Sequence, residues 1–89
     1  MVTEEFITLC KEKVAEFNNA TKSETSDARL NPDDVYVVWY CKTLQNHKAL
    51  LSTPISDGMY YELTYNGDTH ELYFDAYKKW QHLRFAVEE

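Results

Sequence analysis

The chain has 89 residues and 44% hydrophobic content, which suits one folded domain with one core and argues against a disordered chain. Its net charge of -6 disfavours binding to nucleic acid, because phosphates are held by clustered Lys and Arg. The same charge suits a basic protein surface, although it also serves simply to keep a small protein soluble.

Residues 1–18 are predicted to form an N-terminal helix that starts at about Glu4, with Thr3 as its N-cap. An apolar stripe recurs at helical spacing and predicts one buried face. The stripe consists of Phe6, Cys10, Val14 and Phe17. Residues 19–34 are polar and carry no period, which indicates a connector.

Residues 35–74 are predicted to form an antiparallel sheet of four consecutive strands. The first run, VYVVWYC, is β-branched and aromatic on both faces, so we expect it to be a central strand. Short turns make consecutive strands neighbours, which favours a meander. The strands are expected at residues 35–41, 48–53, 59–65 and 68–74.

Residues 75–87 are predicted to form a second helix, capped by Asp75. Its expected inward stripe is Ala76, Trp80, Leu83 and Val87. The predicted fold class is therefore α+β, a four-stranded antiparallel meander flanked by an N-terminal and a C-terminal helix in the order α-β-β-β-β-α. All 89 residues are expected to form a single domain.

The Asn-Gly pair at 66–67 favours a two-residue turn, because a type I′ turn needs positive φ at both positions. In that register Glu62 faces Glu71, and like charges directly opposite each other destabilise a sheet. The same register places Tyr60 opposite Tyr73, and such exposed tyrosines commonly anchor interfaces. These four residues are the candidate partner-binding site. The alternative, in which the tyrosines pack together and the glutamates extend into water, stays open.

No catalytic motif is evident, and the chain is not expected to be an enzyme. Its only glycines, Gly58 and Gly67, are explained by turns, which leaves none for a phosphate-binding loop. Cys41 lies in an apolar strand, where a thiol is usually an inert small hydrophobe. No cofactor or metal is expected, although a zinc site assembled from scattered Cys and His stays open.

Four segments between Asp33 and Trp80 carry a resemblance: VYVVWYCKTLQN, LLST, SDGMYYELTYNGD and DAYKKW. Together they resemble a family of small proteins of unknown function from phages and prophages of Gram-positive bacteria. The resemblance covers about half of the chain. It implies a phage gene product that works in the host bacterial cytoplasm, and it implies no catalytic residues.

The leading hypothesis is a phage-encoded inhibitor that binds a basic surface of a host defence protein, with an anti-CRISPR acting on a Cas9-type nuclease as its specific form. Acidic side chains would then take the place of phosphates. Two alternatives are a protein that sequesters a nucleotide signal by aromatic stacking and a phage regulatory or structural adaptor. A homodimer stays open, whereas no apolar run is long enough for a membrane partner and no direct nucleic-acid contact is expected.

Overall fold

A computed structural model describes residues 1–21 and 29–88 of the chain. This part folds into one α-helix, a short 3-10 turn and four strands that form a single antiparallel sheet in the order β1-β2-β3-β4. The elements are α1 (Thr3–Thr21), η2 (Pro32–Asp34), β1 (Tyr36–Thr43), β2 (Asn46–Ser52), β3 (Met59–Asn66) and β4 (Glu71–Lys78). The α+β class and the antiparallel meander are therefore confirmed.

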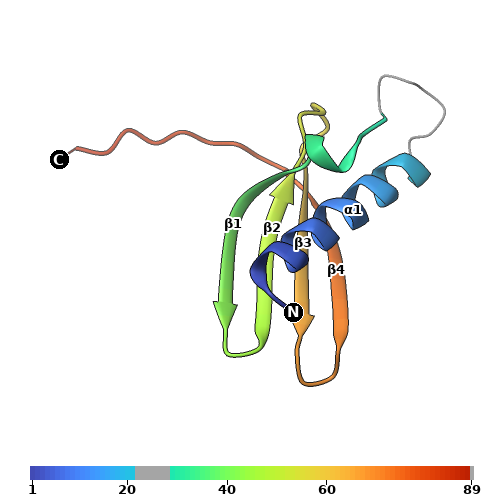
Figure 1. Ribbon diagram of the computed structural model, residues 1–89. Coiled ribbons are helices and arrows are strands. Elements are labelled where there is room, and N and C mark those ends of the chain that lie inside the picture. The colour runs from blue at the N-terminus through green and yellow to red at the C-terminus, as the bar shows by residue number, and fades with distance from the viewer. Residues whose placement is uncertain (22–28, 89) are drawn as a thin grey trace.

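Helix α1 crosses one face of the sheet (Figure 1), and the core lies between the two. Phe6, Cys10 and Val14 from the predicted stripe are completely buried. Burial of each large apolar side chain contributes about 1.5–3 kcal/mol. The core comprises Phe6, Cys10, Val14, Ala15, Leu30, Val35, Ala49, Leu51, Tyr61 and Leu63. The helix therefore stabilises the sheet from one side only, and we call the other side the open face.

A buried histidine on β2, His47, ties the start of the chain to the sheet. Its Nδ1 lies 2.6 Å from the Tyr40 hydroxyl, and its Nε2 lies 3.1 Å from the backbone oxygen of Met1. The Phe6 ring stacks on the imidazole at 5.0 Å. Thr3, expected as an N-cap, lies inside α1, and its hydroxyl is 3.1 Å from that of Tyr40. Both imidazole nitrogens thus have polar partners, which makes the burial of this side chain tolerable.

The predicted connector at 19–34 is partly structured. Residues 19–21 belong to α1, and residues 22–28 lie outside the described part of the chain. The Asn19 side-chain amide donates to the Leu30 carbonyl and accepts from the Leu30 N–H, both at 2.8 Å. One side chain therefore satisfies both backbone groups of a buried residue and fixes the return of the chain to the end of the helix.

Strand β1 lies at an edge of the sheet, so the prediction of a central strand was wrong. Tyr36, Val38 and Trp39 are 50%, 45% and 41% exposed. The apolar run indicated two covered faces, but β1 pairs only with β2 and its register shifts between Val37 and Trp39. The result is an edge strand with a large apolar surface.

The predicted β3–β4 register was also wrong. Tyr65 faces Leu72 and not Asp68, which is a shift of four residues. The loop is longer than two residues, because the last pair of the two strands is Asn66 with Glu71. The Asn66 side-chain oxygen favours this longer loop by accepting from the N–H groups of Asp68 and Thr69, at 2.9 and 3.3 Å. Because the shift is an even number, each side chain still points to its predicted face.

Gly67 lies where the two hairpin ends approach each other closely. His70, and not Gly67, has a positive φ in this loop (59°). A Cβ at Gly67 would overlap the Gln45 carbonyl oxygen in the β1–β2 turn. The Gly67 N–H donates to the Asn46 side-chain oxygen at 2.8 Å, and the Gln45 side chain hydrogen-bonds Asp68. The glycine therefore permits contact between turns that are distant in the sequence.

The predicted C-terminal helix at 75–87 is not found in the described residues. Residues 75–78 continue β4, where Tyr77 pairs with Tyr60 and Lys78 pairs with Met59. The four-residue register shift moves β4 further along the chain, so residues that would start the helix pair with β3. Residues 79–88 form no helix or strand.

The contact at Gly67 gives a stability prediction. Gly67→Ala should lower the free energy of unfolding by about 1–3 kcal/mol, because the added methyl group overlaps backbone of the other turn. Thr69→Ala, an exposed change in the same loop, is the control and should have little effect. Urea unfolding measures both, and a Gly67→Ala protein as stable as the parent would contradict this account.

Burial raises the pKa of the Cys10 thiol from 9.0 to about 12. The proton is therefore held more tightly in the folded state, and the resulting stabilisation is complete below pH 9 and is lost as the pH rises from 9 through 12. Between these limits the parent should lose up to about 1.4 kcal/mol per pH unit relative to Cys10→Ala. Urea unfolding from pH 7 to 11 measures this loss, and parallel stability curves would refute the assignment.

Candidate functional site

The four predicted site residues all lie on the open face, but they are not paired as expected. Tyr60 faces Tyr77, and Glu62 faces Asp75. Tyr73 faces a threonine and Glu71 faces an asparagine. The structure thus brings the predicted residues onto one surface and adds two residues to them. We call the set Tyr60, Glu62, Glu71, Tyr73, Asp75 and Tyr77 the acidic tyrosine face.

Asp75 and Tyr77 were missed because residues 75–87 were predicted to be helical. A period-two signal was nevertheless present over residues 71–77. Acids and tyrosines alternate there with Leu72, Phe74 and Ala76, which lie on the opposite face. Strict alternation is the mark of a half-buried strand, so it could have extended the predicted strand beyond residue 74.

Negative charge is concentrated where β3 and β4 meet. Glu62 and Asp75 stand directly opposite each other, which costs a few tenths of a kcal/mol or more in a sheet. One cation of the chain, Lys48, has its Nζ 3.7 Å from a Glu62 carboxylate oxygen. This pair is partly exposed and contributes little to stability. The two acids therefore remain a favourable position for a further cation.

Two tyrosines of this face, Tyr73 and Tyr77, have raised pKa values. The charge of Glu71, with some burial and a hydrogen bond to that carboxylate, raises the pKa of Tyr73 above its usual value. The charge of Glu62 is the main cause that raises the pKa of Tyr77, followed by burial, the charge of Asp75 and a hydrogen bond to Glu62. Both phenols therefore lie next to a carboxylate, which places a hydroxyl and a negative charge side by side at two positions of the face.

A lysine of the chain already illustrates what this face can hold. The Lys79 Nζ lies 5.6 Å from the centre of the Tyr60 ring, which is within cation–π distance. The backbone N–H of Lys79 donates to the Gly58 carbonyl at 2.7 Å and positions this side chain. Gly58 itself has a φ of 72° in the turn before β3, as the Ser-Asp-Gly signal predicted.

The β1–β2 half of the open face is apolar. A shallow hollow there is lined by Trp39, Cys41, Thr43, Asn46, His47, Lys48 and Thr64. Cys41 is exposed, contrary to its predicted place in a covered strand, and its Sγ lies 3.9 Å from the Thr43 hydroxyl. A threonine hydroxyl is not a base, so this contact does not activate the thiol as a nucleophile. This half of the face can supply apolar contact area next to the acidic tyrosine face.

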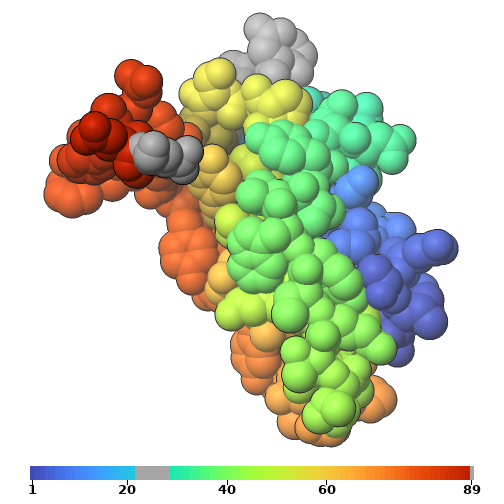
Figure 2. Space-filling model, turned by 90° about the vertical axis from the view of Figure 1, so that its left-hand side faces the viewer, coloured from blue at the N-terminus to red at the C-terminus, as the bar shows by residue number. Residues whose placement is uncertain are grey.

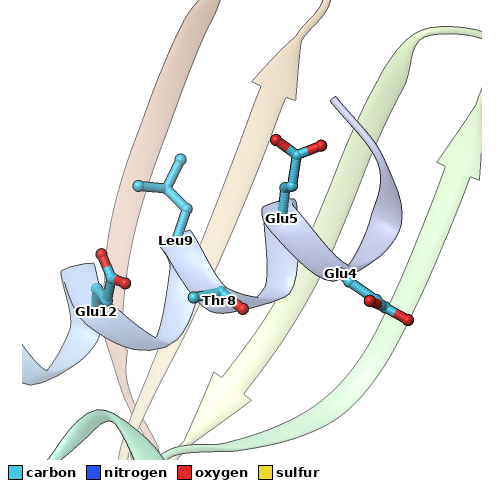
Figure 3. A pocket seen from close by; sticks show the side chains of 5 residues that line it. All are labelled: Glu4, Glu5, Thr8, Leu9 and Glu12. Atoms are coloured by element: carbon cyan, nitrogen blue, oxygen red, sulfur yellow. The ribbon is translucent and has the colours of Figure 1, made fainter.

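A second hollow lies on the outer surface of α1, lined by Glu4, Glu5, Thr8, Leu9 and Glu12. Figure 3 shows the Glu4 carboxylate pointing away from those of Glu5 and Glu12, so these acids do not converge on one position. Across residues 1–21 and 29–88, no group of three or more His, Cys, Asp or Glu is placed to hold a metal ion.

Comparison with known proteins gives one match. The model described as "Family of unknown function (DUF6275)" matches residues 7–87, so the chain belongs to this family. The match runs from α1 through the sheet and into the segment after β4, well beyond the stretch in which a resemblance was noted. No curated protein and no solved structure matches the chain. In the part of the chain described here, no helix is long and apolar enough to cross a membrane.

The raised phenol pKa values can be tested separately. Glu71→Gln should lower the pKa of Tyr73, and Glu62→Gln should lower the pKa of Tyr77, because each change removes the nearest negative charge. NMR titration of the tyrosine Cζ signals measures both values. Glu12→Gln on the helix is the control, and pKa values that stay unchanged in all three variants would show that the carboxylates do not contact these phenols.

Proposed function

We propose that this chain is a non-enzymatic binding protein that uses its open face to dock on a basic surface of another protein. The observation that carries the proposal is the alignment of three acids and three tyrosines on one face that α1 does not cover. Tyrosines with partly exposed rings are enriched at the centre of protein interfaces. The Glu62–Asp75 pair adds a repulsion that a bound cation would relieve.

The chemistry of the face specifies the partner as rich in Lys and Arg. An arginine reaching between Glu62 and Asp75 would form charge-assisted hydrogen bonds with both carboxylates. Its guanidinium would also stack on a neighbouring tyrosine, as Lys79 does on Tyr60. The hydroxyls of Tyr73 and Tyr77 hydrogen-bond Glu71 and Glu62, so at the rim their oxygens would accept hydrogen bonds from the partner's Lys and Arg. The net charge of -6 would speed association at low salt.

The specific form of this proposal is an inhibitor of a host defence protein, encoded by a phage or prophage of Gram-positive bacteria and acting in the host cytoplasm. The resemblance between Asp33 and Trp80 supports that setting. A Cas9-type nuclease is the named target, because its nucleic-acid channel is positively charged and accepts a backbone of phosphates. Carboxylates on a rigid sheet would compete for the same Lys and Arg.

The proposal predicts that a Cas9-type nuclease binds the parent protein and loses DNA cleavage as the protein is added. The double variant Glu62→Lys with Asp75→Lys should bind at least tenfold more weakly, because it reverses two charges at the centre of the face. The matched control, Glu4→Lys with Glu12→Lys, makes the same change in net charge on the outer side of α1. Isothermal titration calorimetry at two salt concentrations, together with a cleavage assay, measures these effects.

The control shows whether a loss of binding comes from the acidic tyrosine face itself or only from the change in net charge. If both double variants lose binding equally, the acidic tyrosine face is not the docking surface. If the nuclease binds and cleaves DNA normally with excess parent protein, the inhibitor form of the proposal is wrong.

A further inference from the structure

The segment after β4 exposes a large apolar surface. Trp80, Leu83, Phe85 and Val87 are 90%, 67%, 78% and 80% exposed. Soluble monomers rarely leave so many large apolar side chains together in water. The family match extends to residue 87, so this segment belongs to the sequence that the family shares. Exposed apolar side chains of this number are typical of an interaction surface.

The chain does not fold this segment onto its own sheet. Figure 1 shows residues 79–88 leaving the end of β4 and running past β1 into solvent. Figure 2, which looks onto the β1 side, places the segment on the opposite side of the sheet from α1. The segment thus extends on the side of the open face, held at its root by the bond from Lys79 to Gly58.

The charges of the segment are opposite to those of the open face. Residues 78–88 contain three basic side chains and one acid, together with His82. The acidic tyrosine face contains three acids, and it already accepts Lys79 over the Tyr60 ring. A basic, aromatic, extended segment complements the acids and tyrosine rings of this face.

We propose that two copies of this chain form a reciprocal homodimer in which the C-terminal segment of each lies across the open face of the other. The inference rests on the proposed function, since both use the same face. Arg84 and His82 of one copy meet the acids of its partner, while the apolar side chains cover the tyrosines and the β1–β2 half. A basic protein partner then competes with self-association for the face.

Direct stacking of two open faces is the less favourable arrangement. It would bring Glu62, Glu71 and Asp75 of one copy toward the same acids of the other, and like charges in an interface cost several kcal/mol. Exchange of the C-terminal segments instead places the basic side chains of each segment against the acids of the partner's open face. It also leaves both copies in identical environments, as a two-fold dimer requires.

The apolar area is sufficient for a stable dimer. Two aromatic side chains of roughly 150–250 Å² each and two aliphatic ones give on the order of 500 Å² per segment. Two segments and the surfaces beneath them come to about 2,000 Å², at the upper end of standard protein interfaces. Since the segments are extended and unpaired in the single copy, part of this gain offsets the entropy of ordering them.

Light scattering coupled to size exclusion tests the dimer on the full chain. The parent should be a dimer at about 100 µM, a concentration above the µM-to-pM dissociation constants of interfaces of this size. Leu83→Ser with Phe85→Ser should be monomeric, and these exposed positions can change without disturbing the core. Leu44→Ser, at an 80% exposed leucine in the β1–β2 turn, is the control and should remain dimeric. A monomeric parent, or a dimeric double-serine variant, would overturn the inference.

A charge swap tests the contact itself. Glu62→Lys with Asp75→Lys reverses the face, and Lys79→Glu with Arg84→Glu reverses the segment, so each variant alone should be monomeric. An equimolar mixture should form a heterodimer, because the basic segment of one variant then meets an acidic face and the acidic segment of the other meets a basic face. Failure of the mixture to associate would overturn the reciprocal arrangement.

The same variants separate this inference from the proposed function. The Leu83→Ser with Phe85→Ser protein keeps its face intact, so it should bind a Cas9-type nuclease at least as tightly as the parent does. Nuclease binding by a monomeric parent would overturn the dimer and leave the docking function standing. If the parent is a segment-exchanged dimer and does not bind the nuclease, the dimer is supported and the docking function is wrong.

Discussion

Burial of the apolar stripe of α1 against the central strands β2 and β3 is the interaction on which this small protein depends. Phe6, Cys10 and Val14 lose all contact with water there, and the sheet has no second helix among the described residues to cover its other side. A chain of this length has limited apolar surface to bury. The core therefore lies on one side of the sheet, and the other side is left as the open face.

The open face has the composition of an interface and is poorly suited to water alone. Its acids repel one another, Tyr73 and Tyr77 have half-exposed rings, and its β1–β2 half holds a mainly apolar hollow. A basic aromatic ligand would satisfy all three features at once. The C-terminal segment after Lys79 has that composition, which links self-association and partner binding to a single surface.

The faces of the strands could be predicted from the sequence, whereas their register could not. Alternation of side chains with period two survives any even shift, so Tyr60, Glu62, Glu71 and Tyr73 reached the expected face although none has its expected neighbour. The register depends on Gly67, whose role is set by the Gln45 carbonyl 22 positions earlier in the chain. Local turn preference favoured a type I′ geometry, but contact between the two hairpin ends determined the loop.

The sequence by itself determined the helix, its buried stripe as far as Val14 (Phe17 is 37% exposed), the meander of four strands and the gathering of acids and phenols away from the core. These features follow from periodicity, which is a local property of the chain. Only the tertiary structure decided that β1 is an edge strand, that β4 pairs with β3 four residues out of the predicted register and that the final apolar side chains stay exposed. Each of these depends on which distant residues compete for the same neighbours, and no local pattern records that competition.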